Sequence, residues 1–143
     1  MAGEIYITAV GRLTADPELR FTPNGGAVAN FTVASNPRKF DRQANDWVDG
    51  TATFWRCEAW TRGKLQLAEN VAESLRKGSP VVVYGELRSR EYETRDGEKR
   101  TATELHVIAV GPDLSWASTN PQQPRNETTN TTSDPAWGDW GTN

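Results

Sequence analysis

Residues 51–60 read TATFWRCEAW, a run that holds two of the six tryptophans of the chain beside one arginine. Successive side chains of a strand point to opposite faces, so the run divides into two sets. One face would carry two aromatic rings, an arginine and a glutamate: Phe54, Arg56, Glu58 and Trp60. The other face is more nearly apolar: Thr53, Trp55, Cys57 and Ala59. If the apolar face packs inward, the first face offers rings to bases and a guanidinium to phosphates; if both faces are buried, the rings are core residues.

One helix is expected after this strand. Leu65, Ala68, Ala72 and Leu75 recur at spacings of three and four residues. A basic last turn, a glycine and a proline follow in the letters KGSP. This pattern predicts a helix over residues 64–77.

Alternating apolar residues and turn signals predict four further strands, over residues 4–10, 27–35, 81–92 and 101–110. The last two would form a hairpin with its turn at residues 95–97. Residues 38–50 are largely polar, with two aromatic residues, Phe40 and Trp47, and we expect a projecting hairpin or long loop there. The resulting order is three strands, one helix and two strands.

This order predicts an all-β fold, a five-stranded Greek-key barrel of the OB type with its helix between strands three and four. An SH3-like barrel or an immunoglobulin sandwich would not place its one strong helix there. Exposed faces and loops of OB folds bind oligonucleotides or oligosaccharides, so the fold alone leaves several ligands open.

Charge and composition change near Pro112. The net charge of −3 comes entirely from the residues after it, which include one base, Arg125, and four acids: Asp113, Glu127, Asp134 and Asp139. From residue 120 onward Pro, Asn, Gln and Thr dominate without periodicity, which is typical of disorder. We therefore expect an OB-fold domain over residues 1–112 and a disordered acidic tail over residues 113–143. Any nucleic-acid contact must come from a local basic patch rather than from bulk positive charge.

Other classes of protein are disfavoured. Cys57 is the only cysteine, which excludes an intrachain disulfide and every multi-cysteine metal motif, and we expect it in the core. His106 is the only histidine, and no glycine-rich phosphate loop occurs, so an enzyme such as a metal-dependent nuclease is a poor fit, and neither a cofactor nor a metal is expected. The N-terminal residues lack a signal-peptide pattern and no run of about 18 apolar residues occurs, so a cytoplasmic location with no membrane contact is expected.

Several strings resemble a known family. Residues 23–30 read PNGGAVAN and residues 75–79 read LRKGS, and both resemble the bacterial single-stranded DNA-binding proteins (SSB) from Ile5 to about Pro112. Four longer strings look like the actinobacterial branch, which includes copies carried by phages and plasmids: TADPELRFTP (14–23), DRQ (41–43), AENVAESL (68–75) and ETRDGEKRT (93–101).

The resemblance implies a homotetramer that binds single-stranded DNA without sequence preference and protects it during replication, recombination and repair. Bases would stack on rings at Phe40, Phe54, Trp60 and Tyr92, with Trp47 a further guess near the hairpin tip. Phosphates would contact basic residues: Arg38, Lys39, Arg56, Lys64, Lys77, Arg88 and Arg90. The subunit interface would include Ile5, Ile7 and Trp55, the last of which could equally be a core residue.

Two questions stay open at this point. An OB-fold adaptor or restart-type replication protein, binding other nucleic acids or protein partners, is the alternative function. Tails in this family end in an acidic cluster and an apolar tip that dock replication and repair proteins, whereas residues 134–143 here read DPAWGDWGTN. Trp137 and Trp140 would form a reduced docking peptide, or the segment is a plain disordered tail.

Overall fold

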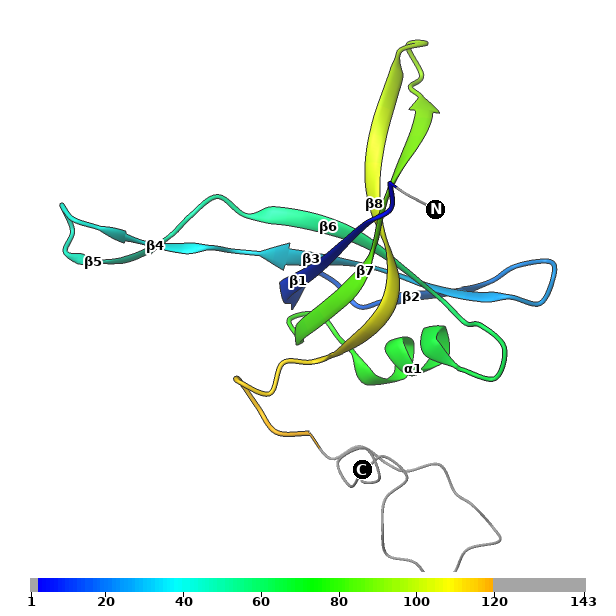
Figure 1. The fold of residues 1–143 in the computed structure, drawn as a ribbon, viewed down its shortest axis with the longest axis horizontal. Helices are drawn as coiled ribbons and strands as arrows, with labels where there is room; N and C mark the ends of the chain where they lie inside the picture. The colour runs from blue at the N-terminus through cyan, green and yellow to red at the C-terminus, as the bar shows by residue number, and fades with distance from the viewer. Residues whose placement is uncertain (1–2, 120–143) are drawn as a thin grey trace, which may run out of the picture.

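The computed structural model describes residues 3–119, which form eight strands and one helix (Figure 1). In chain order they are β1 (Ile5–Leu13), β2 (Glu18–Phe21), β3 (Ala27–Ser35), β4 (Arg38–Asp41), β5 (Asp46–Asp49), β6 (Thr53–Trp60), α1 (Leu67–Ser74), β7 (Pro80–Glu93) and β8 (Lys99–Pro112). The tryptophans at 137 and 140 lie outside the described residues. The described helix, of eight residues, is too short to cross a membrane.

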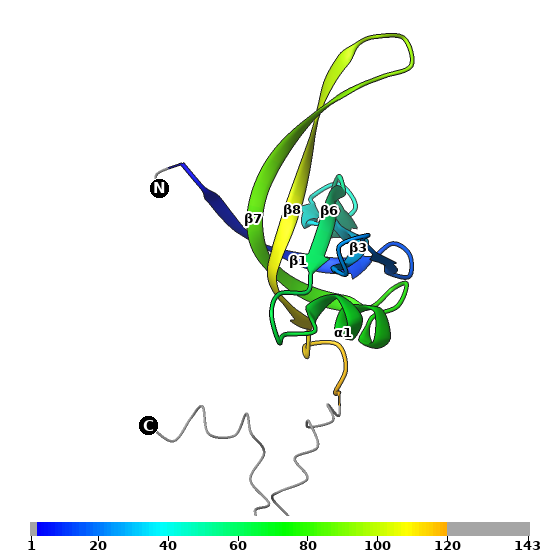
Figure 2. The same cartoon turned by 90° about the vertical axis from the view of Figure 1, so that its right-hand side faces the viewer.

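Six strands form one sheet in the order β1-β7-β8-β6-β3-β2, and a short pairing of β1 with β3 closes it into a barrel. Every pairing is antiparallel except β6 with β8, which is parallel. The helix follows β6 and covers one end of the barrel (Figures 1 and 2). The predicted Greek-key barrel of the OB type, with its helix between the third and fourth barrel strands, is confirmed.

Two hairpins project from this barrel (Figure 1). The first is the separate two-stranded sheet of β4 and β5, and the second is the outer half of β7 and β8. In the second hairpin Glu93 pairs with Lys99, and Gly97 supplies the positive φ that its turn requires. Both hairpins lie where the sequence predicts a projection or a turn.

The helix is shorter than the predicted range because backbone groups at both ends bind elsewhere. Before it, the N–H of Leu65 donates to the carbonyl of Arg62 and forms a separate turn. After it, Leu75 is extended, and the backbone N–H of Lys77 donates to Asp16 Oδ1 at 2.8 Å. Strand β2 is also present, because residues 18–21 lie beside β3 and complete its outer edge.

The core contains the inward-facing residues of the barrel strands and one side of α1. The largest fully buried side chains are Leu105, Val33, Val81, Val83 and Cys57; the helix adds Ala68 and Val71, and Leu75 just after the helix is also buried. Burial raises the pKa of the Cys57 thiol to about 12. Cys57 is therefore the core residue that the sequence predicts.

Close backbone approach explains two glycines. A Cβ at Gly11 would collide with the carbonyl of Ala34, where β1 meets β3 and the barrel closes. A Cβ at Gly85 would collide with the carbonyl of His106, beside a β-bulge that inserts Ile108 between the partners of Tyr84 and Gly85. This bulge sets the register that places His106 opposite Glu86.

Candidate nucleic-acid interface

Strand β6 alternates as the sequence predicts. Phe54 is 63% exposed and Trp60 is 37% exposed, and Arg56 on the same face is exposed as well. Cys57 and Ala59, on the other face, are buried. The rings of Phe54 and Trp60 are therefore surface features rather than core residues.

Neighbouring strands place more cationic side chains on this outer face. Arg56 lies opposite Thr32 of β3 on one side and Glu104 of β8 on the other, and Glu104 in turn lies opposite Arg88 of β7. Within residues 3–119, Arg56 makes no salt bridge. Its guanidinium is available to a ligand.

Arg88 and Arg90 are each paired with a carboxylate and still largely exposed. Arg88 Nε lies 2.6 Å from Glu86 Oε1, and Arg90 Nε lies 3.0 Å from Glu104 Oε1. Their side chains remain 55% and 62% exposed, respectively. Both guanidinium groups can therefore contact a phosphate without giving up the carboxylate.

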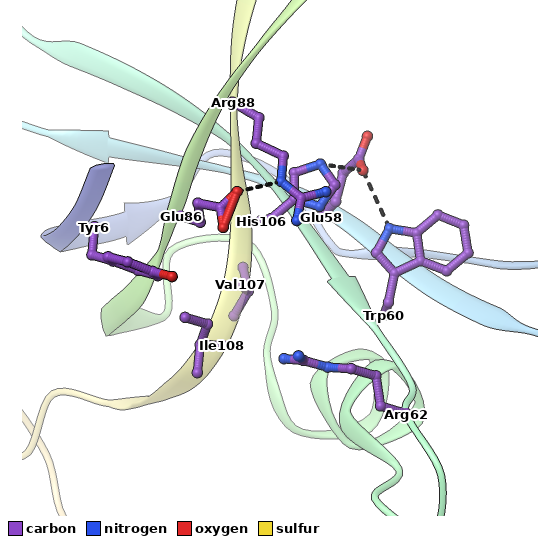
Figure 3. A pocket seen from close by; sticks show the side chains of 9 residues that line it. All are labelled: Tyr6, Glu58, Trp60, Arg62, Glu86, Arg88, His106, Val107 and Ile108. Carbon is purple, nitrogen blue, oxygen red and sulfur yellow. Dashed lines mark hydrogen bonds and ion pairs between the residues drawn. The ribbon is translucent and has the colours of Figure 1, made fainter. Parts of the chain in front are cut away.

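Two open grooves contain most of these groups, while Arg90 lines a neighbouring groove together with Arg56 and Glu104. The first, of about 470 Å³, is lined by Phe54, Arg56 and Tyr92, together with Thr32 and residues 101–103. The second, of about 500 Å³, is drawn in Figure 3, and its lining combines rings, charged groups and aliphatic side chains: Tyr6, Glu58, Trp60, Arg62, Glu86, Arg88, His106, Val107 and Ile108. One face of the sheet thus presents rings and guanidinium groups side by side.

The β4–β5 hairpin carries a separate pair of rings. Phe40 and Trp47 are register partners whose ring centroids lie 5.7 Å apart in an edge-to-face arrangement, and both rings are about half exposed. Arg38 donates to the carbonyl of Trp47 at 3.0 Å, and Lys39 is exposed. The hairpin that carries both rings projects away from the barrel (Figure 1).

A model of the single-strand binding protein family matches residues 6–112. The chain belongs to this family. It is 60% identical over 118 residues to the single-stranded DNA-binding protein of Mycolicibacterium smegmatis. The aligned region covers 82% of this chain and 69% of that protein. It is 51% identical over 144 residues to the protein of the same name from Paenarthrobacter nicotinovorans. Here the aligned region covers 99% of this chain and 82% of that protein.

A solved structure agrees with the family assignment. The crystal structure of a small single-stranded DNA-binding protein from Streptomyces coelicolor matches with a TM-score of 0.68 and 36% sequence identity. The match covers 80% of this chain and 99% of that one. The resemblance to actinobacterial members of the family, predicted from short strings, is confirmed.

The structure does not bring every predicted contact residue together. Lys64 lies in the loop between β6 and α1, and Lys77 lies in the loop between α1 and β7. Neither lysine lines the two grooves described above. Phe40, Trp47, Arg38 and Lys39 form their own group on the β4–β5 hairpin.

The residues predicted at a subunit interface differ in exposure. Ile5 is exposed, whereas Ile7 and Trp55 are partly buried and pack against the core. Residues 5–11 of β1 pair with β7, and in the described chain no strand lies on their other side. The stacked rings of Tyr6 and Tyr84, 6.1 Å apart, extend an exposed apolar surface beside this edge.

The alternation of residues 51–60 predicts that Glu58 lies on this face, but the sequence alone does not reveal the contribution of Tyr6, Arg62 and His106 to the second groove. Arg62 continues the alternation of β6 by two residues and could have been found in that way. Glu58 and His106 meet only through the parallel register of β6 with β8, which no local pattern indicates.

One cluster has the composition of a metal site. Glu58, Glu104 and His106 each place a ligand atom within 4.8 Å of the other two. A cation there would have to compete with the guanidinium of Arg90, which already lies 3.0 Å from Glu104 Oε1. We therefore describe the cluster as part of the ion-pair network on the outer face.

Proposed function

We propose that this chain binds single-stranded DNA without sequence preference and protects exposed strands during replication, recombination and repair, without catalysis. The observation that carries this proposal is the exposure of Phe54, Arg56 and Trp60 on one face of β6, beside Arg88 and Arg90. Stacking tolerates any base because every base has a π-face, and each good stack contributes about 1–3 kcal/mol. Membership of the single-strand binding protein family supports the same conclusion.

Seven basic side chains would contact phosphates: Arg38, Lys39, Arg56, Lys64, Lys77, Arg88 and Arg90. Each contact releases condensed counterions, so affinity falls with salt by a slope of about −0.7 per contact. Arg56, Arg88 and Arg90 contact the strand over the barrel, while Arg38 and Lys39 contact it at the β4–β5 hairpin. Lys64 and Lys77 hold the DNA only if it continues around the end of the barrel where α1 lies.

The same proposal includes a homotetramer in the cytoplasm, at the nucleoid. The unpaired edge of β1 from Ile5 to Gly11 could pair with a second copy, and the apolar surface of Tyr6 and Tyr84 could pack against another. Residues 1–112 would be the binding domain. Residues 113–143 would be a tail that docks replication and repair proteins.

The test is a titration of the full chain with fluorescent oligo-dT at several salt concentrations, with duplex DNA of equal length and an oligosaccharide as controls. Tight binding of oligo-dT, strong tryptophan quenching and a clear salt slope would support the proposal. Equal affinity for duplex DNA, or binding that does not change with salt, would overturn it. A mass measurement of the free protein tests the tetramer separately.

A further inference from the structure

On the outer face, one hydrogen bond and one ion-pair contact link Trp60 to the only histidine of the chain (Figure 3). The indole Nε1–H of Trp60 donates to Glu58 Oε2 at 3.3 Å. His106 Nε2 lies 3.5 Å from the same oxygen. A single carboxylate oxygen therefore connects an exposed ring to a titratable group on the neighbouring strand.

Charge pairing around this network is incomplete. Glu86 is paired with Arg88 and Glu104 with Arg90, whereas Glu58 has neither a lysine nor an arginine partner within residues 3–119. Its ion-pair partner there is His106. At ion-pair distance, the negative charge of Glu58 is thus neutralised only when the imidazole carries a proton, while Arg62 and Arg88 lie farther off in the same groove.

Glu58 lies where its charge affects the binding of an anionic ligand beside Trp60. Its side chain and that of His106 are 27% and 26% exposed, so their charges are less screened than those of a fully exposed pair. An uncompensated carboxylate beside Trp60 would repel the phosphate of a stacked nucleotide. A charged imidazole would remove that repulsion and hold the carboxylate in place beneath the indole N–H.

We propose that Glu58 and His106 are positioning residues for Trp60 and that protonation of His106 tightens the binding of single-stranded DNA. This inference rests on the proposed function. The charged groups around His106 are Glu58 from β6, Arg62 from the segment after β6, Glu86 and Arg88 from β7, and Glu104 with its partner Arg90. Because Arg88 and Arg90 are already paired with Glu86 and Glu104, protonation of His106 changes the net charge beside Glu58.

The first experiment measures oligo-dT affinity between about pH 5.5 and pH 8, the range in which histidines change charge. Ionic strength is held constant throughout. Affinity of the unaltered protein should fall about threefold to tenfold as the pH rises, the fold-change of one net hydrogen bond. His106→Gln should give a flat profile at the weaker level.

A second variant separates charge from structure. Glu58→Gln keeps an oxygen that can accept the indole N–H but removes the negative charge, so its affinity at high pH should exceed that of the unaltered protein and its dependence on pH should be weaker. Glu73→Gln on α1 is the matched control, because Glu73 is exposed and does not line the two grooves, and it should behave like the unaltered protein. A pH profile for His106→Gln as steep as that of the unaltered protein would overturn the inference.

The single histidine also permits a direct measurement. In protein carrying isotope-labelled histidine, the one imidazole signal reports the pH at which His106 is half protonated, and oligo-dT should raise that pH, because linkage is reciprocal. A titration that oligo-dT leaves unchanged would overturn the inference alone. If oligo-dT does not bind at any pH, both the proposed function and this inference are wrong.

Discussion

Two regions of this molecule carry exposed aromatic rings, and they are supported very differently. On the barrel, Phe54 and Trp60 stand on β6, which pairs with β3 along its whole length and with β8 over residues 56–58. On the projecting hairpin, Phe40 and Trp47 stand on two four-residue strands that pair only with each other. The barrel rings are fixed by the scaffold, whereas the hairpin rings are held mainly by each other.

The difference teaches what each region can contribute to binding. Rings on a sheet that is paired on both sides need little ordering when a base stacks on them, so most of the stacking energy appears as affinity. An isolated two-stranded hairpin is only marginally stable, and ordering it on DNA consumes part of the gain. We therefore expect the barrel face to dominate affinity and the hairpin to adapt to the path of the strand.

The strongest test of this comparison removes both barrel rings. Phe54→Ala with Trp60→Ala should weaken oligo-dT binding by well over tenfold, because each stack contributes about 1–3 kcal/mol. Fluorescence anisotropy measures the loss. Trp60→Phe, which keeps a ring, should retain most of the affinity, and Trp55→Phe should leave binding unchanged while sedimentation reports any change in oligomeric state. Full affinity in the double alanine variant would contradict the assignment.

Removing the free guanidinium of the barrel face should have the next largest effect. Arg56→Ala should lower affinity by about tenfold at low salt and reduce the salt slope by about 0.7, since one phosphate contact is lost. The matched variant is Arg38→Ala on the hairpin, whose guanidinium already binds the carbonyl of Trp47 and lies 3.7 Å from Asp49. An equal loss in both variants would show that the two regions contribute alike.

The hairpin rings should give a smaller, non-additive effect. Phe40→Ala and Trp47→Ala should each weaken binding by less than about tenfold, and the double variant should be little worse than either, because each ring holds the other. A double-mutant cycle with oligo-dT measures the coupling. Additive losses as large as those on the barrel would remove the distinction between the regions.

The last prediction concerns chemical labelling in the interior of the same strand rather than DNA binding. Because burial raises the pKa of Cys57 to about 12, its thiolate at pH 8 should be about a thousandfold scarcer than that of an exposed thiol, and alkylation should be slow until the pH approaches 12. Mass spectrometry after timed labelling checks this, with urea-unfolded protein as the reactive control. Fast labelling of the native protein would show that β6 opens and is not a fixed support.

Local patterns in the sequence predict much of this arrangement. Strict alternation along residues 53–60 separates Phe54, Arg56 and Trp60 from Cys57 and Ala59, and the helix pattern fixes the class of barrel. Such patterns work where one face is buried, because a shift by one residue would expose the core.

Other features depend on register between distant strands. The parallel pairing that brings Glu58 beside His106 and the bulge at Gly85 have no local signal. The pairing of Phe40 with Trp47 depends on where the β4–β5 turn falls, and residues 18–21 become a strand only because β3 offers an edge. The roles of the predicted contact residues in DNA binding remain predictions.

The strand order also constrains how the chain can fold during its synthesis. Strand β1 emerges first, yet eight of its residues pair with β7 and only two with β3. Strand β6 can pair with β3 as soon as it is synthesised, but its pairing with β8 over residues 56–58 cannot form until β8, which ends at Pro112, has been made. Loop closure over such separations comes late, so the nascent chain cannot complete its sheet until almost the whole domain has left the ribosome. Until then, the edges of β1 and β6 are exposed to other chains, and these early strands are the segments most in need of a chaperone.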